Sequence, residues 1–230
     1  MRRVFVDRIE GHQAFVAGDR AHHLARVVRL RQGEIVEVSD FRRVFQAKVE
    51  RIEAGSVVFE LIEESQAPEV GPKIELWMSI IKFPRFEWAL EKGVELGAST
   101  IGALAAERSD SRLAQATPKR MDRWRRLAEE AAQQSRRLAP PEILGPRRFS
   151  EIEPVGGAFF LDFEGPPLKD TLESTSQATL AVGPEGGWSD QERTQAIEAG
   201  WRPARLGATV LRSETAAVAG LATLSHLLGV

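Results

Sequence analysis

Two stretches in the last quarter of the chain combine glycine turns with charged residues beside a predicted helix start. Residues 182–189 read Val-Gly-Pro-Glu-Gly-Gly-Trp-Ser, and a second such stretch covers residues 206–216. Gly186 and Gly187 leave backbone N–H groups open to a ligand and allow positive φ angles. A phosphate fits poorly, because Glu185 would repel it and no lysine stands where a phosphate-binding loop needs one. The loops favour a neutral or cationic small molecule with hydroxyls and ring nitrogens; a plain tight turn is the alternative.

The elements around these loops follow from local signals. Residues 179–182, closed by Gly-Pro, are typical of a short buried strand. Ser189 and Glu192 form the pattern of a capping box, which predicts a helix over residues 190–199. Ser213 can cap the helix that follows the second loop. Each loop should therefore lie between a strand and a helix.

Length and composition limit the class of protein. A chain of 230 residues can form one large domain or two small ones with an ample core. No apolar run reaches the about 18 residues that a membrane span needs, and the first residues lack the apolar region of a signal peptide. There are no cysteines, and the four histidines show no metal-binding spacing. We therefore expect a cytoplasmic protein that uses neither a membrane nor a metal.

The net charge of −2 conceals alternating charged blocks. Residues 1–51 contain eleven Lys or Arg against seven Asp or Glu, and residues 105–148 contain eleven against six. The blocks 52–104 and 149–230 are acidic. Two basic blocks separated by acidic ones suit a localised contact with a polyanion. Solvated faces that happen to be basic are the alternative.

The first 67 residues predict a small β-barrel. Short runs rich in Val, Ile and Phe are separated by glycine or polar turns, with one short helix among them over residues 19–28. The predicted strands cover residues 2–8, 13–16, 34–39, 44–51 and 56–62. Small barrels often bind oligonucleotides with one face and its loops. Residues 67–72, with two prolines and a glycine, predict a linker after this domain.

From residue 73 to 230, strand and helix patterns alternate, which predicts an α/β domain. The strand over residues 74–81 is almost continuously apolar, as in a mainly parallel sheet that is covered on both faces. The longest helix should open at Thr117-Pro118 and run to about residue 138. The last helix, residues 214–228, is nearly all small and apolar, which predicts burial and, at Gly220, close approach of another helix.

Several ordered motifs resemble one known family. They are a K…E-W…K…E-L-G pattern over residues 82–97, Arg108-Ser109, Gln134-Ser135 with Arg137 and Pro141-Glu142-Ile143, Gly183-Pro184-Glu185-Gly186-Gly187-x-Ser189, and Leu206-Gly207 with Leu211-Arg212-x-Glu214-Thr215-Ala216. The series resembles the RsmE family of ribosomal RNA methyltransferases, in the trefoil-knotted SPOUT superfamily. The arginine-rich start and His23-Leu24-x-Arg26-Val27 resemble the PUA-like amino-terminal barrel of that family, so the resemblance covers essentially the whole chain. One departure stands out: Leu138 and Ala139 replace Asn-Arg, which removes a basic contact.

The resemblance implies a SPOUT-type knotted α/β domain with a mainly parallel sheet at 73–230, after a PUA-like β-barrel at 1–67, in a homodimer. It also implies that loops after three strands wrap a bent S-adenosylmethionine. The implied cofactor contacts are Leu161, Asp162, Val182, Gly183, Pro184, Glu185, Gly186, Gly187, Leu206, Gly207, Val210, Leu211, Thr215 and Ala216. This cofactor agrees with the cationic, hydroxyl-bearing ligand that the loops favour.

The reaction that the resemblance implies is methylation of uridine N3 at the position usually numbered 1498 in 16S rRNA of the small ribosomal subunit. The uridine N3–H is a weak acid, so forming its anion near neutral pH costs about 3 kcal/mol. Arg212 is the first candidate to stabilise that charge, although a salt bridge to Glu214 is an alternative for it. Glu214 is either the proton acceptor or the residue that orients Arg212.

The implied RNA contacts combine the basic blocks with the middle motifs. They are Arg2, Arg3, Arg26, Arg29, Arg108, Gln134 and Arg137. Two other functions stay open: a SPOUT enzyme that acts on another RNA or base, and an RNA-binding assembly factor without catalysis. The intact barrel and terminal motifs argue against the first, and the intact glycine and arginine motifs argue against the second.

Overall fold

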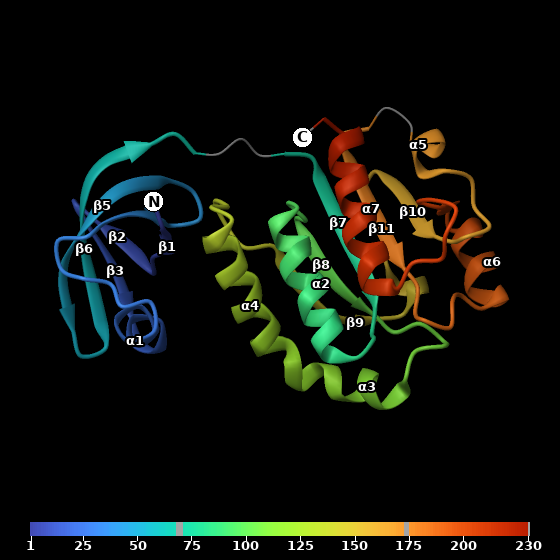
Figure 1. Cartoon of the computed structure of the whole chain (residues 1–230), viewed down its shortest axis with the longest axis horizontal. Helices are drawn as coiled ribbons and strands as arrows, with labels where there is room; N and C mark the ends of the chain where they lie inside the picture. The colour runs from blue at the N-terminus through green and yellow to red at the C-terminus, as the bar shows by residue number, and fades with distance from the viewer. Residues whose placement is uncertain (68–70, 173–174, 230) are drawn as a thin grey trace. The chain divides into compact units, whose positions relative to one another are not determined.

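A computed structural model describes residues 1–67, 71–172 and 175–229 (Figure 1). The chain forms two compact units. The amino-terminal unit comprises residues 1–69 and 132–140, and the carboxyl-terminal unit comprises residues 70–131 and 141–230. Each is described by itself below.

The amino-terminal unit is a curled six-stranded sheet with one helix, α1 (Gly18–Arg26). Its strands, in the spatial order β1-β4-β5-β6-β3-β2, are β1 (Arg3–Phe5), β4 (Ile35–Ser39), β5 (Val44–Glu53), β6 (Ser56–Ser65), β3 (Gln13–Ala17) and β2 (Arg8–Glu10). β1 pairs in parallel with β4, and the other pairings are antiparallel. The predicted strand-rich region with one helix is confirmed, although the run at residues 2–8 forms only the short strand β1, and β2 begins at its last residue.

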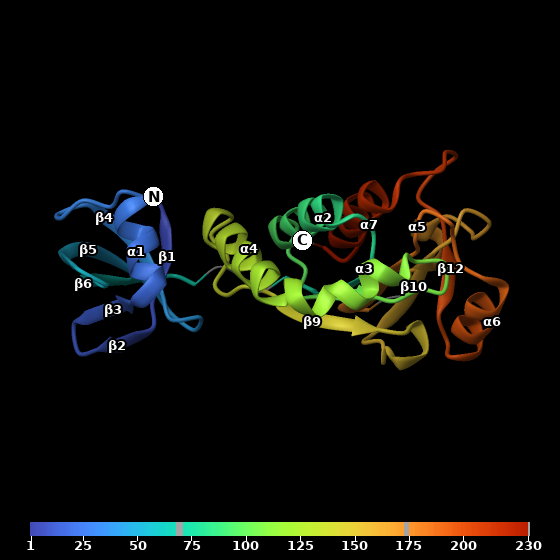
Figure 2. The same cartoon turned by 90° about the horizontal axis from the view of Figure 1, so that it is seen from below.

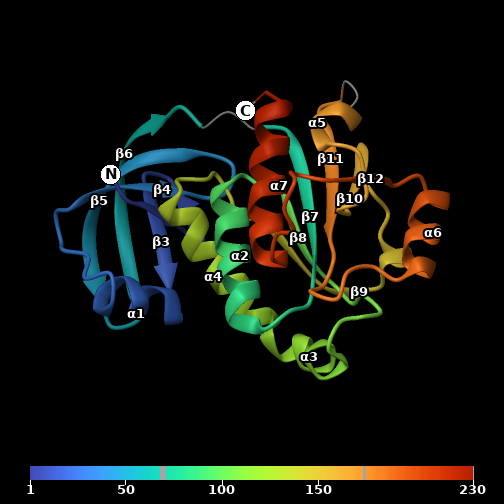
Figure 3. The ribbon, with the colours of Figure 1, turned by 45° about the vertical axis from the view of Figure 1, so that its right-hand side comes forward.

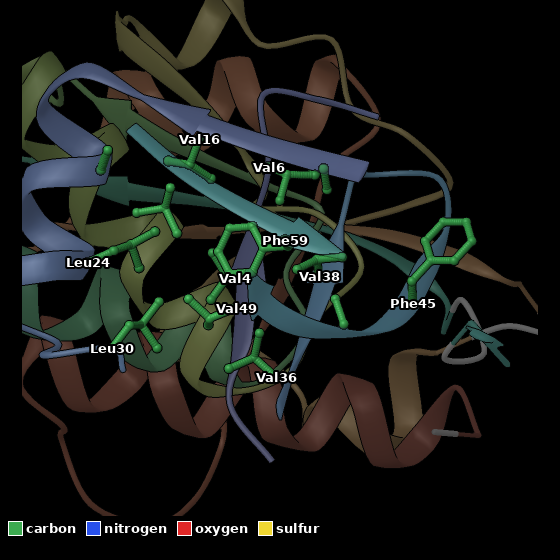
Figure 4. Packing of buried hydrophobic residues seen from close by; sticks show 14 residues of the cluster. Val4, Val6, Val16, Leu24, Leu30, Val36, Val38, Phe45, Val49 and Phe59 are labelled. Atoms are coloured by element: carbon green, nitrogen blue, oxygen red, sulfur yellow. The ribbon is translucent and has the colours of Figure 1, made fainter. Parts of the chain in front are cut away.

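The core of this unit comes from the period-two pattern of the strands. Val36 and Val38 point inward from β4, and Val4 and Val16 meet them from neighbouring elements (Figure 4). Leu24 of α1 packs on the same cluster (Figure 4). The apolar face of α1 and the inward-facing residues of the strands therefore enclose one hydrophobic core.

Residues 132–140 are held by the sheet of the amino-terminal unit. The side-chain oxygen of Gln133 accepts a hydrogen bond from the Phe5 N–H at 3.2 Å, and the Ser39 hydroxyl donates to the Leu138 carbonyl at 2.9 Å. The helix α4 (Met121–Gln134) ends earlier than predicted, because Arg136 adopts a left-handed conformation with φ +56°. Leu138 therefore lies after the end of α4, where its carbonyl accepts the hydrogen bond from Ser39.

The carboxyl-terminal unit contains a six-stranded sheet in which every pairing is parallel. Its spatial order is β12 (Arg202–Ala204), β10 (Gly157–Leu161), β11 (Gln177–Val182), β7 (Lys73–Ser79), β8 (Thr100–Leu104) and β9 (Glu142–Arg147). The helices are α2 (Phe83–Glu95), α3 (Ser111–Ala116), most of α4, α5 (Leu168–Thr171), α6 (Asp190–Glu198) and α7 (Ser213–Leu227). The predicted α/β class with a mainly parallel sheet is confirmed.

Both faces of this sheet are covered. α2 packs on α7 (Figure 2), and α7 contacts β7 and β11. The opposite face carries an aromatic-rich cluster that includes Trp77, Phe149, Phe160, Trp188 and Trp201. Coverage on two sides explains why β7 is almost continuously apolar.

Four named elements of this unit escaped the sequence patterns. The edge strands β9 and β12 contain proline and lack a long apolar run, and α3 and α5 are only six and four residues long. Burial of the last helix within this chain is confirmed for one side of α7: Gly220, Leu221 and Leu224 are buried, whereas Leu227 is 38% exposed. Within the described part of the chain, no helix is long and apolar enough to span a membrane.

Candidate functional site

The loops after β10, β11 and β12 enclose a pocket of about 480 Å³. Ligands in open parallel sheets bind beyond the carboxyl ends of the strands, which is where this pocket lies. Figure 3 shows these strand ends beside the start of α7. The lining residues are Leu161, Asp162, Phe163, Val182, Gly183, Pro184, Glu185, Gly187, Trp188, Arg193, Ala204, Arg205, Leu206, Gly207, Thr209, Val210, Leu211, Arg212, Ser213 and Ala216.

The loop after β11 is anchored by Trp188. Its indole N–H donates to the Leu161 carbonyl at 2.9 Å, and its ring stacks on Phe149 with centroids 4.8 Å apart. A Cβ atom at Gly183 would lie 3.0 Å from this ring, closer than side chains usually approach one another, so glycine suits this position. Gly187 has φ +68°, the left-handed turn that the sequence predicts. Local sequence and one buried aromatic residue together fix this wall of the pocket.

The predicted capping box closes the same loop. The Glu192 N–H donates to the Ser189 hydroxyl at 3.1 Å, and the Ser189 N–H donates to the Glu192 carboxylate at 2.9 Å. The other Glu192 oxygen accepts from the Glu107 N–H at 2.8 Å. This carboxylate therefore joins α6 to the segment after β8 and fixes where the loop ends.

The loop after β12 is tied to the first loop by Ser213, whose hydroxyl donates to the Gly183 carbonyl at 2.8 Å. The prediction that Ser213 caps the last helix is wrong, because Arg212 occupies the N-cap position and makes no side-chain cap. Val210 is 80% exposed in this loop. The serine serves the pocket by joining its two walls.

Two arginines form ion pairs at the border of the pocket. Asp162 accepts from the Arg193 guanidinium at 2.6 Å, and this hydrogen bond raises the pKa of Arg193 above its usual value. Arg85, in the first turn of α2, hydrogen-bonds to Glu185 with Nη1 and places Nε 3.7 Å from a Glu214 oxygen. Sequence reasoning missed Arg85 and Arg193. Arg85 lies at an unassigned position of the motif at residues 82–97. Its role is visible only in the folded chain, where it contacts Glu185.

The predicted cofactor residues gather in one place. All of them line the pocket except Gly186 and Thr215. Gly186 instead receives a hydrogen bond at its carbonyl from Arg108, at 3.0 Å. The sequence missed Phe163, Arg205, Thr209 and Ser213 as lining residues, because their types carry no signal without the fold.

The two predicted catalytic residues lie in different environments. Arg212 is exposed and lines the pocket. Glu214 is buried, does not line it, and is paired with Arg85, so the alternative of an Arg212–Glu214 salt bridge is not what the described residues form. One Glu214 oxygen, Oε2, is buried without a hydrogen-bond partner among the described residues. Glu214 therefore faces α2 and not the space where a ligand would lie.

The predicted RNA contacts are also divided. Arg2, Arg26, Arg29, Arg108 and Gln134 are exposed. Arg3 is 5% exposed, pairs with Glu37 at 3.1 Å and hydrogen-bonds to the Arg136 carbonyl. It therefore holds the amino-terminal unit together and is not accessible for an RNA contact. Arg137 is half-buried, and burial lowers the pKa of its guanidinium.

Comparison with known proteins adds family information. An RNA methyltransferase domain family matches residues 69–225, and an RNA methyltransferase PUA domain family matches residues 16–62. Among curated proteins, the chain is 33% identical to ribosomal RNA small subunit methyltransferase E of Synechocystis, over 90% of this chain and 71% of the relative. It is 32% identical to the protein of that name from Mycobacterium tuberculosis, over 94% of this chain and 87% of the relative.

Among solved structures, the chain is similar to ribosomal RNA small subunit methyltransferase E of Neisseria gonorrhoeae, bound to S-adenosyl methionine. The TM-score is 0.88 at 28% identity, and the match covers 99% of this chain and 98% of the other. The similarity thus extends over both units.

Proposed function

This chain belongs to the RNA methyltransferase family, and from that premise we propose that it transfers a methyl group from S-adenosylmethionine to N3 of a uridine in 16S rRNA of the small ribosomal subunit. The uridine is the one usually numbered 1498. The observation that carries the proposal is the pocket at the ends of β10, β11 and β12, where the motif residues of both glycine loops meet. The curated relatives named above support the substrate class.

The pocket residues fit the proposed cofactor. Leu161, Val182, Leu206 and Leu211 offer apolar surface to an adenine ring. The carboxylate of Glu185 favours a ligand with a positive charge and opposes a phosphate. When bound, S-adenosylmethionine supplies a methyl group that is already activated, so the protein has to supply alignment and a nucleophilic N3.

Arg212 stabilises the charge that develops on the uracil. Its guanidinium is exposed at the pocket and presents fixed N–H donors that suit the uracil oxygens. Forming the N3 anion near neutral pH costs about 3 kcal/mol, which a donor aimed at that charge offsets. Glu214 is buried and paired with Arg85 instead of Arg212, so we assign it neither of its two predicted roles and leave the proton acceptor unassigned.

The amino-terminal unit is proposed to bind the RNA. Residues 1–67 would form the PUA-like RNA-binding domain and residues 73–230 the methyltransferase domain. The exposed residues Arg2, Arg26, Arg29, Arg108 and Gln134, with half-buried Arg137, are the proposed contacts. The trefoil knot, the homodimer, the metal-free site and a cytoplasmic location are parts of the same proposal, supported by the motif resemblance.

Two matched glycine variants test the cofactor site. Gly207 lines the pocket, Gly145 in β9 does not, and a Cβ atom at either position would meet nothing within 4 Å. Neither glycine has a positive φ angle, so Gly207→Leu and Gly145→Leu should both fold. Titration calorimetry with S-adenosylmethionine should show binding by the wild type and Gly145→Leu, and loss of binding by Gly207→Leu. Equal binding by all three would place the cofactor elsewhere.

Nucleoside analysis of methylated rRNA then separates the candidate functions. N3-methyluridine at the expected site supports the proposal. Another methylated nucleoside would favour a methyltransferase of different specificity. RNA binding without cofactor binding or methyl transfer would favour the assembly factor.

A further inference from the structure

Arg85 connects the loop after β11 to the start of α7. It lies in the first turn of α2, directly after β7, and its guanidinium contacts Glu185 of the β11 loop and Glu214 of α7. Figure 3 shows α2 beside α7, with the start of α7 near the end of β11. No motif assigned a role to this residue, although both of its partners belong to motifs.

The two partners differ in burial. The Glu185 side chain is 57% exposed, so water can solvate its carboxylate. The Glu214 side chain is 12% exposed, and its Oε2 atom has no hydrogen-bond partner among the described residues. A buried carboxylate depends strongly on its cation, because removing one member of a buried pair leaves an uncompensated charge. Arg85 therefore hydrogen-bonds directly to the exposed Glu185, and its contact with Glu214, at 3.7 Å, is the one whose loss would leave a buried charge uncompensated.

Arg85 therefore joins Glu185, in the loop after β11, to Glu214, at the start of α7. Glu185 lines the pocket, whereas Glu214 does not. The hydrogen bond from the Ser213 hydroxyl to the Gly183 carbonyl already joins the β11 loop to the start of α7. Arg85 adds a second connection between the same two segments.

We propose that Arg85 is a positioning residue that holds the Glu185 loop against the start of α7, so that the pocket is formed before its ligand arrives. The inference rests on the proposed function, since the ligand tested is S-adenosylmethionine. A preformed site loses less free energy on binding than one that must be ordered first. Arg85 acts through Glu185 and touches no reacting atom.

The variant Arg85→Met keeps the length of the side chain and removes its charge and donors. We expect it to bind S-adenosylmethionine about tenfold more weakly, equivalent to about 1.4 kcal/mol. The control is Arg123→Met. Arg123, in α4, pairs with Glu87 of α2 through two hydrogen bonds of 3.0 Å, and neither residue lines the pocket. The control should bind like the wild type.

A comparison of two ligands separates position from charge. S-Adenosylhomocysteine lacks the methyl group and the positive sulfonium. Loss of a preformed loop should weaken both ligands by the same factor, whereas a purely electrostatic role should change only the affinity for the charged one. Equal weakening, with KM for S-adenosylmethionine raised more than kcat is lowered, supports the inference; a change confined to the charged ligand, or no change, overturns it.

Two further variants keep the test decisive if Arg85→Met fails to fold. Arg85→Lys retains one charge for Glu214 but cannot reach both carboxylates with a rigid fork, so it should bind with intermediate affinity. Glu214→Gln removes the buried charge, and the double variant with Arg85→Met should then bind no more weakly than Arg85→Met alone. Fully additive losses would mean that Arg85 and Glu214 are not coupled, which contradicts a connection between the Glu185 loop and α7 through Arg85.

Failure of the proposed function looks different. A wild-type protein that binds neither ligand overturns the cofactor assignment itself. A wild type that binds both, beside an Arg85→Met variant of equal affinity, overturns only the role of Arg85.

Discussion

The loop after β11 and the loop after β12 form opposite walls of one pocket, but they are held very differently. The first contains a Gly187 N–H bond to the Pro184 carbonyl, the Trp188 anchor and the capping box at Ser189. In the second, no described residue from 206 to 211 makes a hydrogen bond, and Val210 is 80% exposed. The first wall is therefore held by hydrogen bonds along its length, whereas the second is held at its end, where Ser213 bonds to Gly183.

The largest effect should come from breaking the anchor of the first wall. Trp188→Ala removes a buried ring that stacks on Phe149 and donates to Leu161. Truncating a buried aromatic residue costs about 3–5 kcal/mol of unfolding free energy. Denaturant unfolding measures the loss, and Trp201→Ala serves as a control in the same cluster but outside the pocket. If only Trp201→Ala destabilised the protein, Trp188 would not be the anchor.

Arg212→Ala tests the functional side of the second wall. The residue is exposed, so the variant should fold and bind S-adenosylmethionine normally. Losing a donor aimed at a developing negative charge should lower kcat about 100- to 1000-fold. Single-turnover methylation of rRNA measures the loss, with calorimetry as the check on cofactor binding. Unchanged turnover would remove Arg212 from the mechanism.

A smaller effect is expected from the cap of the first wall. Ser189→Ala deletes the acceptor of the Glu192 N–H and should cost about 1 kcal/mol of unfolding free energy. Thr194→Ala, which removes a hydroxyl that bonds within α6, is the matched control. A loss equal to that of the control would mean that the capping box adds nothing to the helix.

The smallest change in stability should follow from Val210→Ser. Substitution of a side chain that is 80% exposed should alter the unfolding free energy by less than about 0.5 kcal/mol. If a second copy of the chain covers this loop, the variant should nevertheless weaken the dimer, as sedimentation of dilute protein would reveal. An unaltered dimer would mean that the partner covers another surface.

The motifs predicted where the pocket lies better than they predicted the role of each residue. The glycine loops and the capping box follow from signals within a few residues, and they lie where the sequence places them. Roles that depend on distant partners were missed or misassigned. Arg3 was predicted to contact RNA, but it is buried against Glu37, 34 residues away. Glu214 was predicted in the active site, but it faces Arg85.

The sequence alone determined the alternation of strands and helices, the turns and the first-loop cap, because propensity and capping act over a single turn or strand. The tertiary structure decided which charges pair across long separations, such as Arg85 with Glu185, 100 residues apart. It also decided where α4 ends, since the turn at Arg136 is held by the sheet of the amino-terminal unit. Burial and pairing depend on which surfaces the folded chain brings together, and no local pattern encodes that choice.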